Sequence, residues 1–278
     1  MAGKKNKSDM SFLDHLEVLR WHLMRSVIAI MVGAVLIFMN RVFVMDQILL
    51  APTHSDFHTY RWFCQFSAWL SGLLPDVVDK DALCFSELKI TLLNTKLQGK
   101  FYAAMIVSFV GGIILAFPYI FWETWRFIKP ALHKQESKKA RGVVFFGTIL
   151  FAMGISFGYF MISPLAIHFL ATFEIAAGIA EMIDMNSIMG TITSSTLACG
   201  VIFELPVVTY YLAKIGLISS TFMKKYRKHS FVVTLILSAI ITPPDVFSQV
   251  LVAIPIVVLY ELSIIIAKRM EKKRELDA

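Results

Sequence analysis

Acidic side chains in unusual surroundings are the residues of this sequence best suited to do chemistry. Glu204 is the sole charged residue of the apolar run 197–212, whose centre reads GVIFELPVV. Inside a membrane an ionisable group costs roughly 2.5 to 3.5 kcal/mol, so it usually faces a bundle interior or a water-filled cavity and marks a pathway. The alternative is a protonated acid bonded to a neighbouring helix, with Pro206 loosening the helix. Physics alone favours neither interpretation.

A second group of acids lies among many basic residues: Asp14, Glu17, Glu123 and Glu136. If these acids form exposed ion pairs, they neutralise Lys and Arg, and each pair contributes under about 1 kcal/mol. They would also be the groups that hold a ligand carrying guanidinium groups, through charge-assisted and often bidentate hydrogen bonds.

Motifs for nucleotide or hydrolytic chemistry are missing from the sequence. It has no G-x-x-x-x-G-K-[ST], no H-E-x-x-H and no G-x-S-x-G. An intramembrane protease would need a Ser of TSSTLACG with His168 or His229 as base, but Ser and Thr on membrane helices more often pack helices. His54 and His58 have metal-like spacing without further ligands, so we interpret them as solvated loop residues. We therefore expect that the protein is not an enzyme and that it holds no cofactor or metal.

The composition indicates a membrane protein. Hydrophobic residues make up 57% of the chain and charged residues 17%, with a mean hydropathy of +0.67. Most of the apolar runs approach the roughly 20 residues that cross a bilayer as helix, and none alternates as barrel strands do. The prediction is an all-α polytopic protein with six transmembrane helices, near 23–43, 101–122, 143–166, 187–213, 231–241 and 247–267.

Basic residues predict the orientation, because Lys and Arg near helix ends stay in the cytoplasm. They cluster before the first helix, after the second and fourth, and in the tail, whereas 167–186 contains acids and no Lys or Arg. Both termini are therefore expected in the cytoplasm. The net charge of +7 then reflects topology, and no nucleic acid is needed to explain it.

The chain is expected to form one membrane domain, 1–278. Within it lie a cytoplasmic N-terminal segment (1–22), an external loop (45–99) and a cytoplasmic tail (268–278). The first helix lacks a cleavage site and is expected to remain as an anchor. Cys64 and Cys84 would meet an oxidising compartment, so we favour a disulfide, with two unpaired thiols as the alternative. Cys199 is expected to be a small core residue.

Five motifs in this order resemble the TatC family, the receptor subunit of the twin-arginine protein translocase. They are SFLDHLEVLRWHL, FPYIFWETWRFIKPALHKQE, FGYFMISPLAIHFL, GVIFELPVV and ITPPDVFSQVLVAIPIVVLYE. The resemblance covers about residues 12–269 except the external segment near 56–85, which looks longer than in familiar members. It implies a concave, glove-like bundle in the inner membrane that binds signal peptides of folded cargo. It also implies recruitment of the single-helix proteins TatA and TatB, self-association in a receptor complex, and export driven by the proton-motive force.

The resemblance also implies two sets of site residues. The signal-peptide site would comprise Glu136, Glu17, Arg20, Leu19, His15 and Phe127. The surface that contacts partner helices within the membrane would comprise Glu204, Gln249, Phe247 and Asp245. Glu204 would then face the concave, partner-accessible side.

One position departs from the family pattern. Where the family has a glutamate in its H-L-x-E-L-R motif, this chain has Val18, and the glutamate stands one place earlier, at Glu17. One residue corresponds to about 100° of rotation on a helix. Either Glu17 reaches the same ligand from a turned helix, or one of two acidic contacts is missing. A proton-coupled secondary transporter with Glu204 as the proton site is the alternative function, and an intramembrane protease is the third.

Overall fold

The computed structural model describes residues 12–54, 57–73, 84, 92–128, 140–172, 183–242 and 246–277, with backbone alone at 12–15, 70, 73, 140, 141, 246, 247 and 274–277. Helices make up nearly all of it. The elements are α1 (Phe12–Met39), α2 (Arg41–Phe43), η1 (Val44–Leu49), η2 (Ala51–Thr53), α3 (His58–Leu73), β1 (Leu92–Leu93), α4 (Gly99–Ile128), α5 (Ala140–Phe157), η5 (Gly158–Ile162), α6 (Ser163–Thr172), β2 (Ile183–Asp184), α7 (Met185–Phe203), α8 (Leu205–Lys214), α9 (Ser220–Lys225), α10 (Arg227–Ile241) and α11 (Val246–Asp277).

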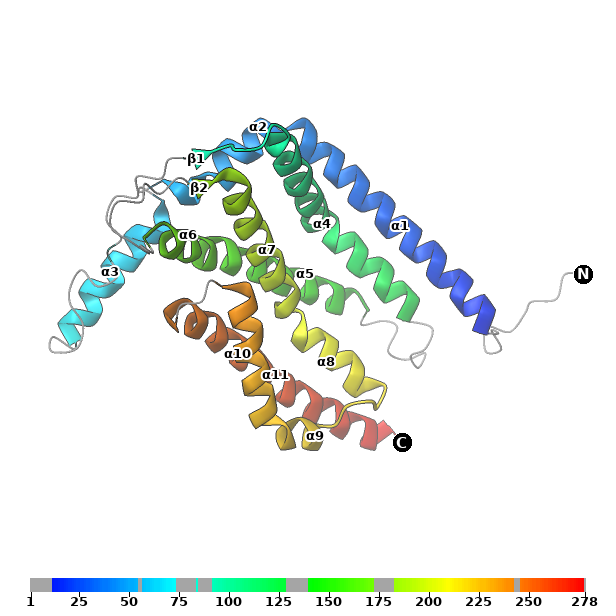
Figure 1. Ribbon diagram of the computed structural model, residues 1–278. Coiled ribbons are helices and arrows are strands. Elements are labelled where there is room, and N and C mark those ends of the chain that lie inside the picture. The colour runs from blue at the N-terminus through cyan, green and yellow to red at the C-terminus, as the bar shows by residue number, and fades with distance from the viewer. Residues whose placement is uncertain are drawn as a thin grey trace, which may run out of the picture.

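Long apolar helices confirm the predicted fold class. In the described chain, 5 segments are long and apolar enough to cross a membrane: Leu16–Met39, Gly99–Ile128, Gly142–Thr172, Met185–Lys214 and Ser248–Lys273. They correspond to five of the six predicted runs. Figure 1 shows α1 and α4 side by side, α7 and α8 in the middle, and α10 and α11 on the opposite flank.

The remaining run, 231–241, is longer as a helix than the sequence suggested. It forms α10, which begins at Arg227 and has 15 residues. That length corresponds to about 22 Å, still short of the roughly 30 Å of a hydrocarbon core. α10 pairs with α11, and Arg227 Nη2 lies 2.6 Å from Glu261 Oε2 across that pair.

Two glycines bring α1 and α4 into close contact. A methyl group added at Gly112 would lie 2.6 Å from the Ala34 nitrogen and 2.7 Å from the Ile30 oxygen, and one added at Gly33 would lie 2.9 Å from the Gly112 oxygen. In membranes, small residues at a crossing let helix backbones approach and gain van der Waals contact. This contact fixes the first helix against the second long span.

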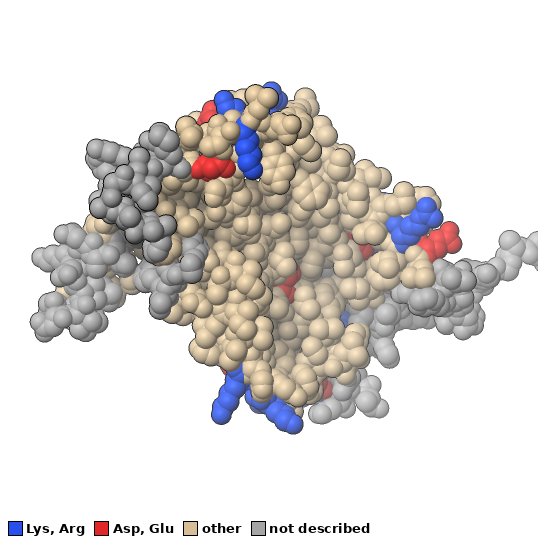
Figure 2. All heavy atoms as spheres, in the orientation of Figure 1, with Lys and Arg blue, Asp and Glu red and all other residues tan. Residues whose placement is uncertain are grey.

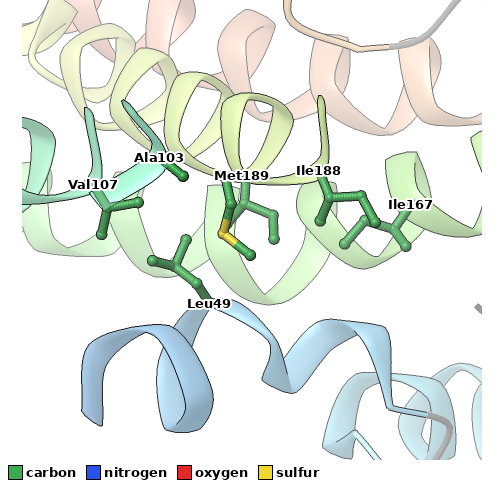
Figure 3. Close-up of a cluster of buried hydrophobic side chains, with 7 residues drawn as sticks. Leu49, Ala103, Val107, Ile167, Ile188 and Met189 are labelled. Carbon is green, nitrogen blue, oxygen red and sulfur yellow. The ribbon is translucent and has the colours of Figure 1, made fainter. Parts of the chain in front are cut away.

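We call the end of the bundle where α1 begins and α4 ends, residues 16–26 and 119–128, the near end. The opposite end, where α1 ends and α4 begins, is the far end, residues 39–53 and 92–104. A buried core of seven side chains lies against it, most of them labelled in Figure 3: Leu49, Ala103, Val107, Ile167, Ile188, Met189 and Ile192. They come from η1, α4, α6 and α7. Next to them β1 and β2 pair in parallel, with Leu92 opposite Ile183.

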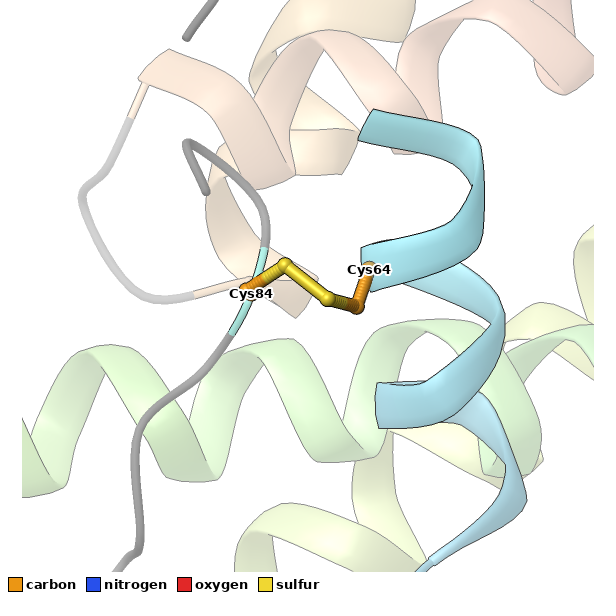
Figure 4. The surroundings of a disulfide bond; sticks show 2 residues. All are labelled: Cys64 and Cys84. Atoms are coloured by element: carbon orange, nitrogen blue, oxygen red, sulfur yellow. A yellow bond between two sulfur atoms is a disulfide. The ribbon is translucent and has the colours of Figure 1, made fainter. Parts of the chain in front are cut away.

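The predicted disulfide is confirmed. Cys64 on α3 is bonded to Cys84, and their Cα atoms lie 4.3 Å apart (Figure 4). Cys199 is the free cysteine and is buried in α7, as expected of a small core residue.

Charge is distributed as a membrane protein requires. On the face in Figure 2, Lys, Arg, Asp and Glu gather at the margins, while the middle is almost entirely uncharged apart from acidic atoms in its hollow. Such a band separates the two charged ends of the described chain.

Candidate functional site

The near end of the bundle brings together the two motifs that the sequence assigned to one site. The ring centroid of Phe127 on α4 lies 6.1 Å from that of His22 on α1, with the rings edge to face. Leu19 and Arg20 stand less than one helical turn before His22, and both side chains are exposed. The N-terminal motif and the stretch around Phe127 therefore lie side by side.

A buried carboxylate joins these two helices. Glu123 is 1% exposed, and one of its oxygens is hydrogen-bonded to Nδ1 of His22. Arg126 Nη1 lies 3.3 Å from the other oxygen, and Arg25 Nη1 lies 3.9 Å from the oxygen that His22 binds. The phenol of Tyr119 is also hydrogen-bonded to this carboxylate.

This cluster satisfies the charge of Glu123. A buried carboxylate is tolerated when it is paired and hydrogen-bonded, and here it receives both kinds of partner. The guanidinium groups of Arg25 and Arg126 are about half exposed, so the pairs involving them are screened by solvent. The His22 bond is the shielded part of the cluster. Glu123 is thus a structural clamp between α1 and α4.

The face of α1 that carries His22 also settles where Glu17 points. His22, Ser26 and Gly33 follow one another along the side of α1 that packs on α4. Val18, four residues before His22, lies on this side and is partly buried, whereas Glu17 is exposed. Glu17 and Arg20 form no ion pair with any other described residue. The one-residue shift therefore moves the acid from the packed side to the exposed side.

Two of the predicted peptide-site residues cannot be placed. Glu136 lies outside the described residues, and His15 is described by its backbone alone. Leu19, Arg20 and Glu17 are exposed on α1, and Phe127 is partly buried on α4.

Glu204 lies at a break between two helices. α7 ends at Phe203 and α8 begins at Leu205, with Pro206 in its first turn, where a missing N–H costs no helical bond. The Glu204 carbonyl still accepts from the nitrogens of Val207 and Val208, each at 3.0 Å. The chain is therefore nearly continuous through the break.

The side chain of Glu204 is almost fully buried, beside Gly147 of α5, and its place on a concave, partner-accessible side stays a prediction. The residue is 7% exposed, and neither carboxylate oxygen has a hydrogen-bond partner of good geometry among the described residues, although the backbone of Phe151 on α5 makes a looser polar contact with it. A methyl added at Gly147 of α5 would lie 3.3 Å from Glu204 Oε2 and 2.6 Å from a ring carbon of Phe121. The absence of a side chain at Gly147 leaves the room that the carboxylate occupies.

Of the three predicted outer-turn residues, Gln249 has a described side chain. Gln249 Nε2 donates to the Leu235 oxygen at 3.2 Å, so its amide ties α11 to α10. Phe247 is described by its backbone alone, and Asp245 lies outside the described residues.

Sequence reasoning named Glu123 but missed its partners His22, Arg25 and Arg126. The available signal was the matching spacing: His22 and Arg25 are three residues apart, as are Glu123 and Arg126, and residues three apart share a helix face. Nothing local showed that these two faces meet. His54 and His58 are exposed, and no group of three or more metal-ligating residues occurs in the described part of the chain.

The fold and the near end define an all-helical, multi-pass membrane protein without a recognisable centre for catalysis in its described residues. A profile of the family "Sec-independent protein translocase protein (TatC)" matches residues 14–255. The chain belongs to this family and is a component of the Sec-independent translocase.

Individual relatives and a solved structure support this family assignment. The TatC protein of Blattabacterium sp. is 39% identical over 271 residues, covering 98% of this chain and 100% of the relative. That of Desulforapulum autotrophicum is 34% identical over 277 residues, covering 100% of this chain and 90% of the relative. A crystal structure of a twin arginine translocase receptor, TatC, matches with a TM-score of 0.65 and 27% identity, over 92% of this chain and 99% of that one.

Proposed function

We propose that this chain is the signal-peptide receptor and core subunit of a twin-arginine translocase that exports folded proteins across the inner membrane. The observation that carries the proposal is the contact of His22 with Phe127, because it joins the two motifs that would form one peptide site. Family membership and the likeness to the crystal structure of a twin arginine translocase receptor support it.

The peptide's arginines would bind to carboxylates at the near end. Glu136 would accept a bidentate pair from one guanidinium group, and Glu17 would approach the second from the exposed side of α1. Leu19, Phe127, Arg20 and His15 would line the remainder of the site. Glu123 is already paired, so its part would be to hold α1 and α4 in place.

Both termini would lie in the cytoplasm, with the near end facing the signal peptide. TatA- and TatB-type helices would assemble around Glu204, Gln249, Phe247 and Asp245, and copies of the chain would associate in a receptor complex. The proton-motive force would supply the energy, since the sequence carries no nucleotide-binding motif.

Photo-crosslinking of a twin-arginine peptide to membrane vesicles containing this chain tests the proposal. Wild-type protein should capture the twin-arginine peptide well and its twin-lysine variant poorly, because an ammonium does not reproduce the planar fork. Glu136→Ala should abolish capture while leaving the protein inserted. Glu261→Gln is the matched control, because Glu261 is an acid that pairs with Arg227 on the opposite flank. Normal capture by Glu136→Ala would remove the assigned site.

A proton-coupled transporter remains the second candidate, because both oxygens of the buried Glu204 carboxylate lack a hydrogen-bond partner of good geometry among the described residues. Uptake of a small solute by the purified chain in proton-loaded vesicles would favour it. A requirement for single-helix partners and a peptide-bearing cargo favours the translocase.

A further inference from the structure

The 16-residue helix α3, in the loop where the family resemblance gave no alignment, has three distinct faces. The first is covered. Its members are nearly inaccessible and follow one another around one side of the helix: Thr59, Tyr60, Phe63, Ser67 and Ser71.

The second face is exposed and aromatic. Trp62, Phe66 and Trp69 are spaced by four and three residues, so they lie within one arc of the helix. They are 51%, 39% and 60% exposed. Their rings form a continuous stack, with centroids 5.7 Å apart between Trp62 and Phe66 and 5.9 Å apart between Phe66 and Trp69.

The third face is exposed and contains no large apolar residue. It carries His58, Arg61, Gln65 and Ala68, and α3 as a whole contains no acid. Successive residues turn by about 100°, so Phe66 and Ala68 point to nearly opposite sides of the helix. A helix in water gains nothing from exposing two tryptophans and a phenylalanine together. This division is typical of helices that lie in the plane of a membrane surface.

Fixed contacts hold α3 at the far end of the bundle. The Tyr60 hydroxyl donates to the Pro52 oxygen at 2.7 Å and lies 3.3 Å from the Pro164 oxygen. Burial raises the pKa of this phenol, so the group stays protonated and able to donate. Cys64, near the middle of α3, is also bonded to Cys84 (Figure 4).

The aromatic surface continues onto a membrane span. Phe57, just before α3, stacks on Phe160 at 6.0 Å, and Phe160 is 47% exposed on the span 142–172. In Figure 1, α3 runs across the direction of α1, α4 and α7 and extends beyond the bundle. The helix thus starts at the lipid-facing surface and runs sideways from it.

We propose that α3 lies in the headgroup region of the leaflet at the far end, with Trp62, Phe66 and Trp69 inserted toward the acyl chains and the face of Arg61 and Gln65 in water. Aromatic side chains prefer this zone because their rings are apolar while the indole N–H reaches hydrogen-bond partners. The occupant of the aromatic face is lipid. The inference is independent of the signal-peptide site.

Spin labels on the full-length protein in lipid nanodiscs test this placement. A ketone-bearing amino acid replaces Phe66 in one variant and Ala68 in another and is coupled to a nitroxide, which leaves the native disulfide untouched. Collision rates are measured with oxygen, which concentrates in lipid, and with a water-soluble nickel chelate. The ratio of oxygen to nickel collisions should be several-fold higher at position 66 than at 68. Labels at Trp62 and Arg61 repeat the comparison, in case one replacement perturbs folding.

Each other outcome overturns the proposal. If both positions meet nickel equally, the aromatic face is in water. If position 66 meets neither reagent, protein covers it, as in an interface with a partner or a second copy. If both positions are rich in oxygen and poor in nickel, α3 is immersed in the hydrocarbon core.

Discussion

His22 and Glu123 are hydrogen-bonded to one another although 101 residues separate them in the chain. Glu123 brings two arginines to the same place, and the ring of Phe127, one turn further along α4, lies edge to face with His22. The bond therefore sets the position of α1 on α4 at the end where the signal-peptide site is proposed.

Removing either partner of this bond should destabilise the protein. Truncating one partner of a buried, charged hydrogen bond costs about 1 to 3 kcal/mol, so we expect His22→Ala and Glu123→Ala each to lower the unfolding free energy by that amount. The double variant should cost less than the sum, with a coupling of at least about 0.5 kcal/mol. Unfolding in mild detergent measures both. Strictly additive effects would show that the bond contributes nothing.

The displaced glutamate of α1 gives a graded prediction for peptide capture. Glu17→Ala should reduce crosslinking of a twin-arginine peptide less than Glu136→Ala does, because Glu17 points about 100° away from the family position. Val18→Glu should strengthen capture by restoring an acid on the side of His22. Leu16→Glu is the matched control, since it adds a charge to the same turn on an exposed side. If Glu17→Ala is as damaging as Glu136→Ala and Val18→Glu has no effect, the register assigned to this helix is wrong.

The glycine contact between α1 and α4 predicts different effects for two similar substitutions. Gly112→Ala should lower the unfolding free energy by about 1 to 3 kcal/mol, because the new methyl meets rigid backbone of α1. Gly190→Ala, on α7, meets nothing within 4 Å and should be neutral or stabilising by up to about 1 kcal/mol. Thermal unfolding of the two variants side by side checks this. Equal stability would mean that α1 shifts freely on α4.

Much of the fold was predictable because membrane helices leave a strong local signal. Five of the six apolar runs became long spans, and the cysteine pair was expected in the external loop. The length of α10 was underestimated because its first turn is polar, from Arg227 to Ser230, and hydropathy does not detect polar helical turns. The count of six spans stays a prediction.

The candidate site was predictable only in part. Motif residues such as Leu19 and Phe127 were named from the resemblance, and the structure brings their helices together. The partners of Glu123 were missed because a hydrogen bond between helices distant in sequence depends on helix rotation and crossing. The burial of Glu204 could not be predicted because the space beside Gly147 forms only when α5 packs on α7. The three faces of α3 also depend on tertiary burial.

The short helix α10 predicts a locally thin bilayer. With 15 residues it spans about 22 Å, so the membrane must thin or the turn after it must sink below the headgroups. Depth measurements with nitroxide labels at Ser230 and Ile240 should give a smaller separation along the membrane normal than labels at the two ends of α4 give. Labels at full headgroup height on both sides would contradict this expectation.

Topology has its own test. Cysteines introduced at Lys138 and Asp184 should react with an impermeant maleimide from opposite sides of the membrane, Lys138 from the cytoplasm and Asp184 from outside. The native pair Cys64–Cys84 is bonded and Cys199 is buried, so the background should be low. Labelling of both new cysteines from one side would overturn the predicted orientation.

Substitutions of Glu204 should affect stability and transport differently. Its carboxylate is buried and has no hydrogen-bond partner of good geometry among the described residues, and burying such a group costs about 1 to 3 kcal/mol by mutational scales. Glu204→Leu should therefore leave the unfolding free energy unchanged or raise it by up to that amount, while transport of a twin-arginine cargo falls. Glu204→Gln should retain the fold and show an intermediate transport defect, because it remains polar without the charge.

The matched control for Glu204 is Thr209→Val, a change of similar shape at a buried position of α8, which should affect transport little. A large loss of stability in Glu204→Leu would show that the carboxylate makes a structural bond. Normal transport in that variant would remove Glu204 from the mechanism. If Glu204→Leu abolished proton-driven solute uptake by the purified chain and left cargo export intact, the transporter would be favoured instead. Proton coupling without a peptide cargo is the behaviour that distinguishes the two functions.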